Sequence, residues 1–374
     1  MVSAGIGTAA RTTLGRRRGL LTALAGLLVL GWHSVPPPPP SLNGLAKTPA
    51  IETDLRSHTQ SVEISVLTYN VADLPWPVRA GRGAALARIG DQLAALREEG
   101  RAPDIVLLQE AFTEKSLRIA ERAGYPNLAE GPEADHNSGR LGGDEAQDFV
   151  ANRSFWKGER LGKVLGSGLM VLSDYPVVEV YRSSFRRQAC AGFDCLANKG
   201  VLLAAIQIPG VPEPVEVLTT HMNSKRSSGV PRPRYTRAHY FQSLDVRSHF
   251  GQAPRKDGRA LIAAGDFNTK GDEERLAYLT GGNLFSLVRY ACQSQAACDF
   301  RLSPRTARPW LETQDLQAFF SGSRITVTPV RAELMFHEPV AGERLSDHDG
   351  YLVTYRLSWP LKDKTAPFSV AAAP

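Results

Sequence analysis

The stretch that decides the fold runs Ala264-Gly265-Asp266-Phe267-Asn268-Thr269. It follows an apolar run, Ala260 to Ala264, which predicts a buried strand that ends in a glycine turn. Asp266 and Asn268 are two residues apart, so on an extended backbone both side chains point to the same side. A carboxylate and an amide in that arrangement suit a metal-bound phosphate or an attacking water.

Polar residues follow apolar runs in the same way at other places along the chain. Each of these endings supplies an oxygen ligand or an imidazole, and His348 also has a neighbouring carboxylate that could fix its tautomer, as a general base requires. Five such endings point to one shared site. The other four are Thr68-Tyr69-Asn70, Leu107-Leu108-Gln109-Glu110, Thr220-His221-Met222-Asn223 and Ser346-Asp347-His348.

Each ending also has a structural explanation when it is taken alone. Glu110 could cap a helix that begins near Thr113, a role that acidic residues often fill. Asn70 could form a turn, and His221 could be a hydrogen-bonded core histidine. The functional interpretation therefore depends on the five endings as a set.

The pattern in the remainder of the chain predicts many strands and few helices. Leu86, Ile89 and Leu93 form an apolar stripe that predicts a helix over Gly83–Glu99, and a second helix is expected over Arg234–Phe250. This pattern favours an α+β sandwich of two packed mixed sheets flanked by helices over a single doubly wound sheet. The expected strands are Val62–Tyr69, Asp104–Leu108, Leu169–Ser173, Val177–Tyr181, Val201–Ile208, Val215–Thr220, Leu261–Ala264, Ile325–Val330 and Tyr351–Arg356.

The charge of the chain is concentrated at its beginning. The net charge is +6, but residues 1–50 contain five basic residues and no acid, which leaves +1 for the remainder. A nucleic-acid-binding domain usually carries a basic excess, so the near-neutral remainder argues against DNA as the natural partner.

The first residues predict export. Arg16-Arg17-Arg18 precede an apolar stretch, Gly19 to Trp32, which has the length of a signal-peptide core and is short for a bilayer span. An uncleaved anchor is the alternative, because no clear Ala-x-Ala site follows. We expect a secreted or periplasmic protein with a signal peptide or membrane anchor at 1–34, a Pro-rich linker at 35–60, a catalytic domain at 61–360 and a tail at 361–374.

The four cysteines form two close pairs, Cys190/Cys195 and Cys292/Cys298. In an exported protein such pairs predict two short disulfide loops. A zinc site is the rival, but neither pair is a Cys-x-x-Cys and no histidine pair stands nearby at ligand spacing.

As an ordered set, the five endings resemble the endonuclease/exonuclease/phosphatase superfamily, the deoxyribonuclease I-like metal-dependent phosphodiesterases with a four-layered sandwich. The resemblance extends over roughly residues 62–356. It implies that Glu110 binds a divalent cation, usually Mg²⁺ with Mn²⁺ or Ca²⁺ as alternatives, and that Asn70 and Asp347 lie close by. Carboxylate and amide oxygens suit Mg²⁺, which needs few protein ligands.

The resemblance also implies the roles of the remaining residues. His348 would act as general base on water and would be oriented by Asp266 or Asp347. His221 and Asn223 would hold the phosphoryl oxygens with help from Asn268, and we expect His221 to act in its charged form.

Three segments resemble the bacterial neutral sphingomyelinase branch of this superfamily: Asn70–Pro75, Gly168–Pro176 and Asp194–Gly200. The resemblance implies a phosphodiesterase that prefers a phospholipid to nucleic acid. We expect a monomer that contacts membrane surfaces, for which Trp76 in the loop after Asn70 is a candidate; the alternative is that Trp76 packs on its own loop. Two alternatives are an extracellular nuclease and a non-catalytic binding protein. The nuclease is favoured by a basic cluster, Lys225, Arg226, Arg232, Arg234 and Arg237.

Overall fold

A computed structural model of the chain describes residues 43–75, 78–252, 258–281, 286–294, 298–301 and 313–361. The chain divides into two compact units, residues 1–39 and 40–374, and all described residues belong to the second. The expected signal peptide or anchor at 1–34 and Trp76 lie outside the described residues, as does the expected tail beyond Leu361. In the part of the chain that is described, no helix combines the length and apolar character needed to cross a bilayer.

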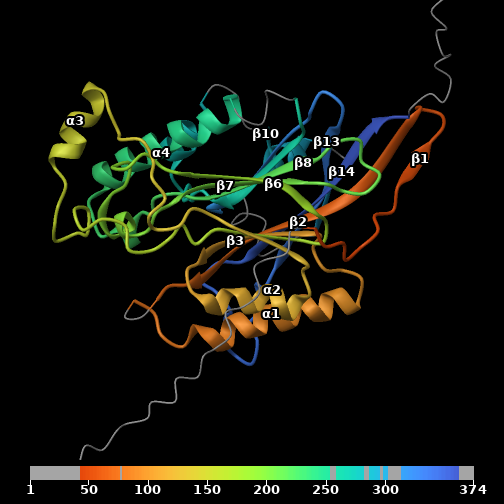
Figure 1. The fold of residues 1–374 in the computed structure, drawn as a ribbon, viewed down its shortest axis with the longest axis horizontal. Helices are drawn as coiled ribbons and strands as arrows, with labels where there is room; N and C mark the ends of the chain where they lie inside the picture. Colours follow the sequence, from red (N-terminus) through yellow and green to blue (C-terminus); the bar gives the residue numbers. More distant parts are fainter. Residues whose placement is uncertain are drawn as a thin grey trace, which may run out of the picture. The chain divides into compact units, whose positions relative to one another are not determined.

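Two β-sheets form the centre of this unit (Figure 1). In the first sheet the strand order is β11-β13-β14-β2-β3-β5-β4, and β1 pairs with the beginning of β2. Its strands are β1 (Glu52–Asp54), β2 (Thr59–Asp73), β3 (Ile105–Ala111), β4 (Asn127–Glu130), β5 (Met170–Ser173), β11 (Asp299–Arg301), β13 (Thr326–Met335) and β14 (Gly350–Pro360).

The second sheet has the order β10-β12-β9-β8-β7-β6. Its strands are β6 (Val177–Ser184), β7 (Gly200–Ile206), β8 (Val215–His221), β9 (Leu261–Asp266), β10 (Ser286–Leu287) and β12 (Asp315–Phe320). The nine strands that were expected are confirmed, with ends that differ by a few residues. The strands that were not expected from the sequence are β1, β4, β10, β11 and β12.

Helices cover the outer face of each sheet. Figure 1 shows α1 (Arg82–Glu98) and α2 (Leu117–Ala123) side by side below the sheets, with α4 (Arg232–Gln252) on the opposite side. α5 (Glu273–Thr280) packs against α4. The remaining described helices are α3 (Asp144–Ala151), α6 (Val288–Ser294), and the 3-10 turns η1 (Glu114–Ser116), η2 (Gly192–Leu196) and η3 (Arg226–Ser228). The predicted four-layered sandwich is confirmed.

Alternation along β2 shows how one strand serves two apolar layers. Val62, Ile64 and Val66 are buried in the core between the sheets. Leu67 and Tyr69 are buried with residues of α1 and α2 in a separate outer core. Successive side chains on a strand point to opposite faces, so a strand covered on both sides must be apolar at both sets of positions.

Part of the segment expected as a linker packs on the domain. β1 pairs with β2, the Asn127 side chain bonds both backbone groups of Gly44 at 2.8 Å, and Lys47 pairs with Asp104 at 2.8 Å. The linker prediction is therefore wrong for residues 43–60. Apolar periodicity could not reveal this, because β1 lies at a sheet edge with all three residues exposed and is held by backbone hydrogen bonds.

The direction of pairing brings the five endings to one edge. β2 is parallel to β3, and β8 is parallel to β9, so both strands of each pair end on the same side. Antiparallel pairing places the beginning of β14 next to the end of β2 and the beginning of β12 next to the end of β9. Asp315 is thereby the register partner of Asp266.

Candidate active site

Five of the predicted side chains form one polar cluster, in which three of them lie within 3.8 Å of Oδ2 of Asp266 and Glu110 joins through Asn70. Asn70 donates from Nδ2 to this oxygen at 3.2 Å and to Glu110 Oε1 at 3.0 Å. His221 Nε2 lies 3.5 Å from it, and His348 Nε2 lies 3.8 Å from it. The ends of strands from both sheets thus share one polar cluster.

The cluster lies in a cavity of about 1120 Å³. One part of its wall is apolar, with Leu74, Phe112, Leu165, Phe193 and Leu196. Another part is basic, with Lys225, Arg226, Arg232 and Lys270. The cavity therefore offers apolar contacts and positive charge beside the polar cluster.

The backbone turns sharply where two of these residues leave their strands. Glu110 and Asn268 both have a φ of 54°, in the left-handed region that side chains other than glycine rarely adopt. The register between β2 and β3 also shifts between Asn70 and Asp73. Such conformations cost on the order of 1 kcal/mol each and persist where the surrounding structure holds them. Here they redirect Glu110 and Asn268 towards the cavity, which both residues line.

The acid that orients His348 is Asp315. Its Oδ2 lies 2.8 Å from His348 Nδ1, and its side chain is 5% exposed. The sequence-based choice of Asp266 or Asp347 is therefore wrong: Asp266 is 3.8 Å from the other ring nitrogen, and Asp347 pairs with Arg79 at 3.3 Å. Adjacency in sequence placed Asp347 beside His348, but its side chain turns outwards and is 67% exposed.

The charges around His348 favour its protonated form. Burial lowers the pKa of His348, but the charge and hydrogen bond of Asp315, with the charges of Asp266 and Asp347, outweigh burial and raise the pKa to about 10. On the cavity side, the Gln314 amide lies 2.7 Å from His348 Nε2. His348 is thus a strong base whose second nitrogen faces the cavity.

His221 is in the opposite state. Burial, together with the charge of Lys199, holds the pKa of His221 well below its usual value, so its imidazole is neutral. The expectation that His221 acts in its charged form is therefore wrong. Lys199 lies 3.1 Å from His221 Nε2 and pairs with Asp194 at 2.5 Å, so the positive charge on this wall belongs to the lysine. Sequence reasoning noted the segment that contains Lys199 without assigning it to the site.

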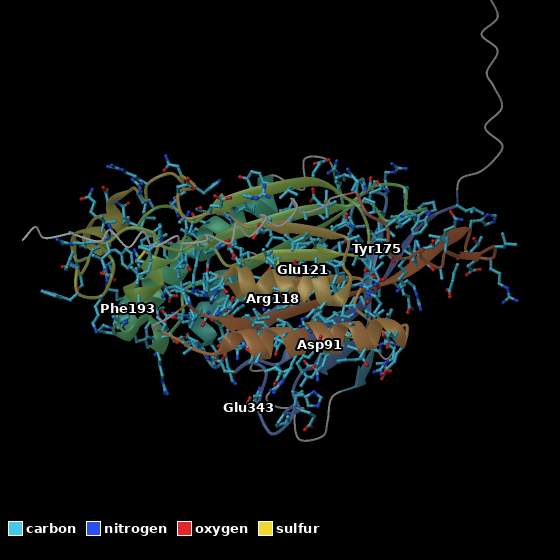
Figure 2. All side chains as sticks on the ribbon, turned by 60° about the horizontal axis from the view of Figure 1, so that its bottom comes forward. Asp91, Arg118, Glu121, Tyr175, Phe193 and Glu343 are labelled. Atoms are coloured by element: carbon cyan, nitrogen blue, oxygen red, sulfur yellow. A yellow bond between two sulfur atoms is a disulfide. The ribbon has the colours of Figure 1, made fainter. Side chains whose placement is uncertain are left out.

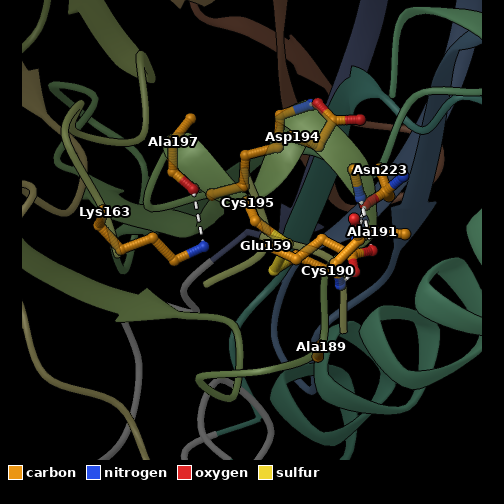
Figure 3. The surroundings of a disulfide bond; sticks show 12 residues. Glu159, Lys163, Ala189, Cys190, Ala191, Asp194, Cys195, Ala197 and Asn223 are labelled. Carbon is orange, nitrogen blue, oxygen red and sulfur yellow. Dashed lines mark hydrogen bonds and ion pairs between the residues drawn. A yellow bond between two sulfur atoms is a disulfide. The ribbon is translucent and has the colours of Figure 1, made fainter. Parts of the chain in front are cut away.

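Asn223 is not brought into the cavity. Its Oδ1 accepts from the Ala191 N–H at 2.8 Å, and its Nδ2 donates to the Ser224 carbonyl at 2.9 Å. Figure 3 shows Asn223 beside Ala191 and the Cys190–Cys195 disulfide. Asn223 supports this loop instead of facing a substrate. Asn268 does line the cavity, and its Nδ2 donates to the Met222 carbonyl at 3.1 Å.

Both predicted disulfides are confirmed, Cys190–Cys195 and Cys292–Cys298. The basic cluster, by contrast, is divided. Arg234 pairs with the buried Glu159, and Arg237 pairs with Glu145 away from the cavity. Only Lys225, Arg226 and Arg232 line the cavity.

The donor set fits a hard divalent cation. Glu110 and Asp347 supply carboxylates on the cavity wall. Asn70 turns its NH₂ group to Glu110, and its Oδ1 accepts from the Ala72 N–H at 3.0 Å, so it supports Glu110 and presents no oxygen of its own. Burial raises the pKa of Glu110 in spite of the hydrogen bond from Asn70 and the charge of Lys199, so a cation at this carboxylate would offset an existing electrostatic cost.

A second possible metal-binding group consists of Asp266, Asp315 and His348, whose ligand atoms lie within 4.8 Å of one another. His348 and Asp315 are already hydrogen bonded to each other through Nδ1 and Oδ2. This arrangement suits the second group for proton transfer, and the Glu110 group is then the one that could hold a metal.

Known proteins share this architecture. A sphingomyelinase from Mycobacterium tuberculosis is 24% identical over 306 residues, which are 79% of this chain and 53% of that protein. The chain thus spans about half the length of the curated relatives it matches. Sphingomyelinase C from Streptomyces griseocarneus is 18% identical with a TM-score of 0.52, and the match covers 78% of this chain and 99% of that one.

A further solved structure, D. rerio TDP2 complexed with a single-strand DNA product, is 17% identical with a TM-score of 0.51 and covers 78% of this chain and 98% of that one. At these identities the structures establish the fold alone. Residues 67–348 match the Endonuclease/Exonuclease/phosphatase family. With the four-layered fold and this match over most of its length, the chain belongs to the endonuclease/exonuclease/phosphatase family of phosphoester hydrolases.

Proposed function

We propose that the chain is an exported, metal-dependent phosphodiesterase whose substrate is a phospholipid. The observation that carries this proposal is the convergence of His348, held by Asp315, with Asp266, His221 and Glu110 at one cavity. A general base, buried carboxylates and a cationic wall are what hydrolysis of a phosphodiester by water requires.

His348 would take the proton of the attacking water at Nε2. The raised pKa of His348 makes the neutral imidazole the minor form near pH 7. In that neutral form Asp315 keeps the proton on Nδ1, which leaves Nε2 free to accept. The carboxylates of Asp315 and Asp266, which raise the pKa of His348, stabilise the imidazolium that results. Gln314 contacts the same nitrogen at 2.7 Å, so water must replace this contact before the proton moves.

Lys199 and His221 would face the phosphoryl oxygens from the other wall. Lys199 supplies the positive charge. In the present contact of 3.1 Å its ammonium donates to Nε2 of neutral His221, so Nε2 must gain a proton and this contact must open before His221 can donate to a phosphoryl oxygen. A divalent cation at Glu110, with Asn70 and Asp347 close by, would withdraw charge from a phosphoryl oxygen when bound. Magnesium suits this oxygen-rich set, and manganese and calcium are the alternatives.

A phospholipid is favoured because apolar side chains form part of the cavity wall. Leu74, Phe112 and Leu165 would contact the acyl chains of the substrate, which a nucleotide lacks. The sphingomyelinase relatives support the same choice. A nuclease is the second candidate, favoured by the basic residues Lys225, Arg226 and Arg232 at the cavity.

Export would bring the protein to such a substrate. Two disulfides form in oxidising compartments and are rare in the cytosol, which supports the export signal inferred for residues 1–34. We further propose one catalytic domain that continues to about residue 360 and acts as a monomer in contact with membrane surfaces.

A substrate panel with and without EDTA tests the proposal. We expect hydrolysis of sphingomyelin or phosphatidylcholine, little cleavage of plasmid DNA or phosphoinositides, and loss of activity in EDTA with recovery on adding Mg²⁺. Glu110→Gln should lower turnover by about two orders of magnitude or more, because an amide is a poor ligand for a hard cation. Glu114→Gln, at a nearby exposed acid, is the matched control and should behave like the unchanged protein.

Two results would contradict the proposal. Full turnover in excess EDTA would show that catalysis does not need a divalent metal. If no phosphodiester were cleaved, a non-catalytic binding protein on this fold would be the better explanation.

A further inference from the structure

The loop between α3 and β5 exposes an unusual set of apolar side chains. Trp156 is 86% exposed, and Phe155, Leu161 and Val164 are each more than half exposed. Phe193, at η2, is 48% exposed. We call Phe155, Trp156, Leu161, Val164 and Phe193 the aromatic rim. Soluble monomers rarely gather exposed apolar groups in this way unless the surface binds a partner.

The aromatic rim borders the cavity of the candidate active site. The backbone N–H groups of Val164 and Leu165 both donate to the Leu196 carbonyl, at 2.8 and 3.0 Å. Lys157 Nζ lies 5.8 Å from the centre of the Phe193 ring, which is labelled in Figure 2. Leu165, Phe193 and Leu196 line the cavity, so whatever contacts the aromatic rim lies at the mouth of the site.

The loop that carries the aromatic rim is firmly anchored. Glu159 is completely buried, accepts from the N–H groups of Ser154 and Gly192, and pairs with Arg234. Lys163 donates to the Ala197 carbonyl at 2.9 Å, as Figure 3 shows. These contacts fix the backbone on both sides of Trp156. The apolar groups are therefore held outwards and are not left exposed by a loose loop.

The charges beside the aromatic rim are positive. Lys157 and Arg160 are exposed, whereas Glu159, the one acid in residues 152–165, is buried in its pair with Arg234. A tryptophan prefers the boundary between water and acyl chains, and lysine and arginine are attracted to anionic headgroups. The apolar groups on this loop suit the acyl-chain region of a lipid surface, and the basic groups beside them suit its headgroup region.

We propose that the aromatic rim docks on the surface of an anionic phospholipid bilayer and sets the cavity mouth against its headgroups. This inference rests on the proposed function, since it supplies the surface on which a phospholipid substrate would be met. The binding itself needs no catalysis, so it can be measured in EDTA, where we expect no hydrolysis of the vesicle lipids.

Vesicle sedimentation of the full chain tests the proposal, with vesicles of phosphatidylcholine containing about 30% phosphatidylserine. Exchanging Phe155 and Trp156 together for serine should raise the dissociation constant at least about tenfold. Leu55→Ser is the matched control and should leave it unchanged, because Leu55 is 72% exposed but follows β1, far from α3 in Figure 1. All variants keep residues 1–34, so that segment is the same on both sides of each comparison.

Two further variants locate the contact. Trp156→Phe should preserve binding but remove the blue shift of tryptophan emission that vesicles produce in the unchanged protein. Lys157→Glu with Arg160→Glu should weaken binding to the anionic vesicles, and added salt should weaken the binding of this variant less than that of the unchanged protein. Equal affinity of the serine double variant and the unchanged protein would overturn the proposal.

The proposal would also be overturned if the serine exchanges converted a dimer to a monomer in sedimentation velocity without changing vesicle binding, since the rim would then contact a second copy of the chain. Hydrolysis of a soluble diester, bis(p-nitrophenyl) phosphate, separates this inference from the proposed function. Vesicle binding without diester hydrolysis would support the docking surface and contradict the proposed phosphodiesterase activity. Diester hydrolysis without vesicle binding would support the activity and contradict the docking surface.

Discussion

Glu159 holds together three segments that are far apart in sequence. Its carboxylate accepts from Ser154 N–H at 2.5 Å, from Gly192 N–H at 2.9 Å, and from Arg234 Nε and Nη2 at 2.7 and 3.0 Å. Exchanging it for glutamine keeps the size of the side chain but removes the charge. The glutamine also brings an NH₂ group to a place where every partner is a donor.

The structure sets the size of the effect on the free energy of unfolding. Removing one partner of a buried ion pair costs about 3–5 kcal/mol. Arg234 keeps some compensation, because its side chain is 16% exposed and it also donates to the Phe149 carbonyl at 2.9 Å. We therefore expect Glu159→Gln to cost about 3 kcal/mol, the lower end of that range.

Glu145→Gln is the matched control. Glu145 also pairs with an arginine of α4, Arg237 at 3.3 Å, but its side chain is 69% exposed. An exposed pair of this kind contributes less than about 1 kcal/mol. Urea unfolding at neutral pH, followed by circular dichroism, measures both variants against the unchanged protein.

The difference between Glu159→Gln and the unchanged protein should also depend on pH. Burial raises the pKa of Glu159, but the hydrogen bonds from Arg234, Gly192 and Ser154 outweigh burial and lower it below 4.5. A lowered pKa in the folded state contributes stability above the unfolded value, and this contribution is lost as the pH falls through the folded value. A loss for Glu159→Gln no larger than that for Glu145→Gln would refute the reasoning.

Two other predictions concern the buried polar groups near the site. Asp315→Asn should lower kcat by about two to four orders of magnitude with little change in KM, because Asp315 positions the general base and does not bind substrate. Steady-state kinetics on a soluble diester measures both constants. A raised KM instead of a lowered kcat would indicate a structural role for Asp315. His239 donates to the Phe267 carbonyl at 2.8 Å, and burial, with the charge of Arg275, lowers its pKa to about 3. The unfolded chain then binds more protons between pH 3 and 6.5, so stability falls on acidification, by about 3 kcal/mol at pH 4. His239→Gln should remove that part of the pH dependence in urea titrations, and an unchanged slope would contradict it.

Most of the fold could be predicted because apolar runs mark buried strands wherever they occur. The position of the site followed from where those runs stop. Asp315 was missed because it is the first residue of β12, and its relation to His348 arises only from antiparallel pairing with β9. No spacing between residues in the sequence indicates that β12 pairs with β9.

The rule of alternate residues failed where a strand had already ended. β8 stops at His221, so the backbone beyond it is no longer extended and Asn223 turns to the disulfide loop. β9 likewise stops at Asp266, but there the left-handed turn at Asn268 brings its side chain to the cavity, so Asp266 and Asn268 meet for a reason that the rule does not contain. Protonation states were also beyond the sequence, because those of His221 and His348 depend on which charges the fold places beside them.

The pairing of β14 with β2 determines when during folding the candidate active site can form. Tyr351 is the register partner of Thr68, so the strand that follows His348 joins the strand that leads to Asn70 across nearly the whole described domain. Contacts between segments so distant form late, because the chain between them must first be closed into a loop. A growing chain thus lacks its site until β14 has been made and has paired. Enzyme activity in this protein reports complete folding, and fragments that end before β14 should be inert.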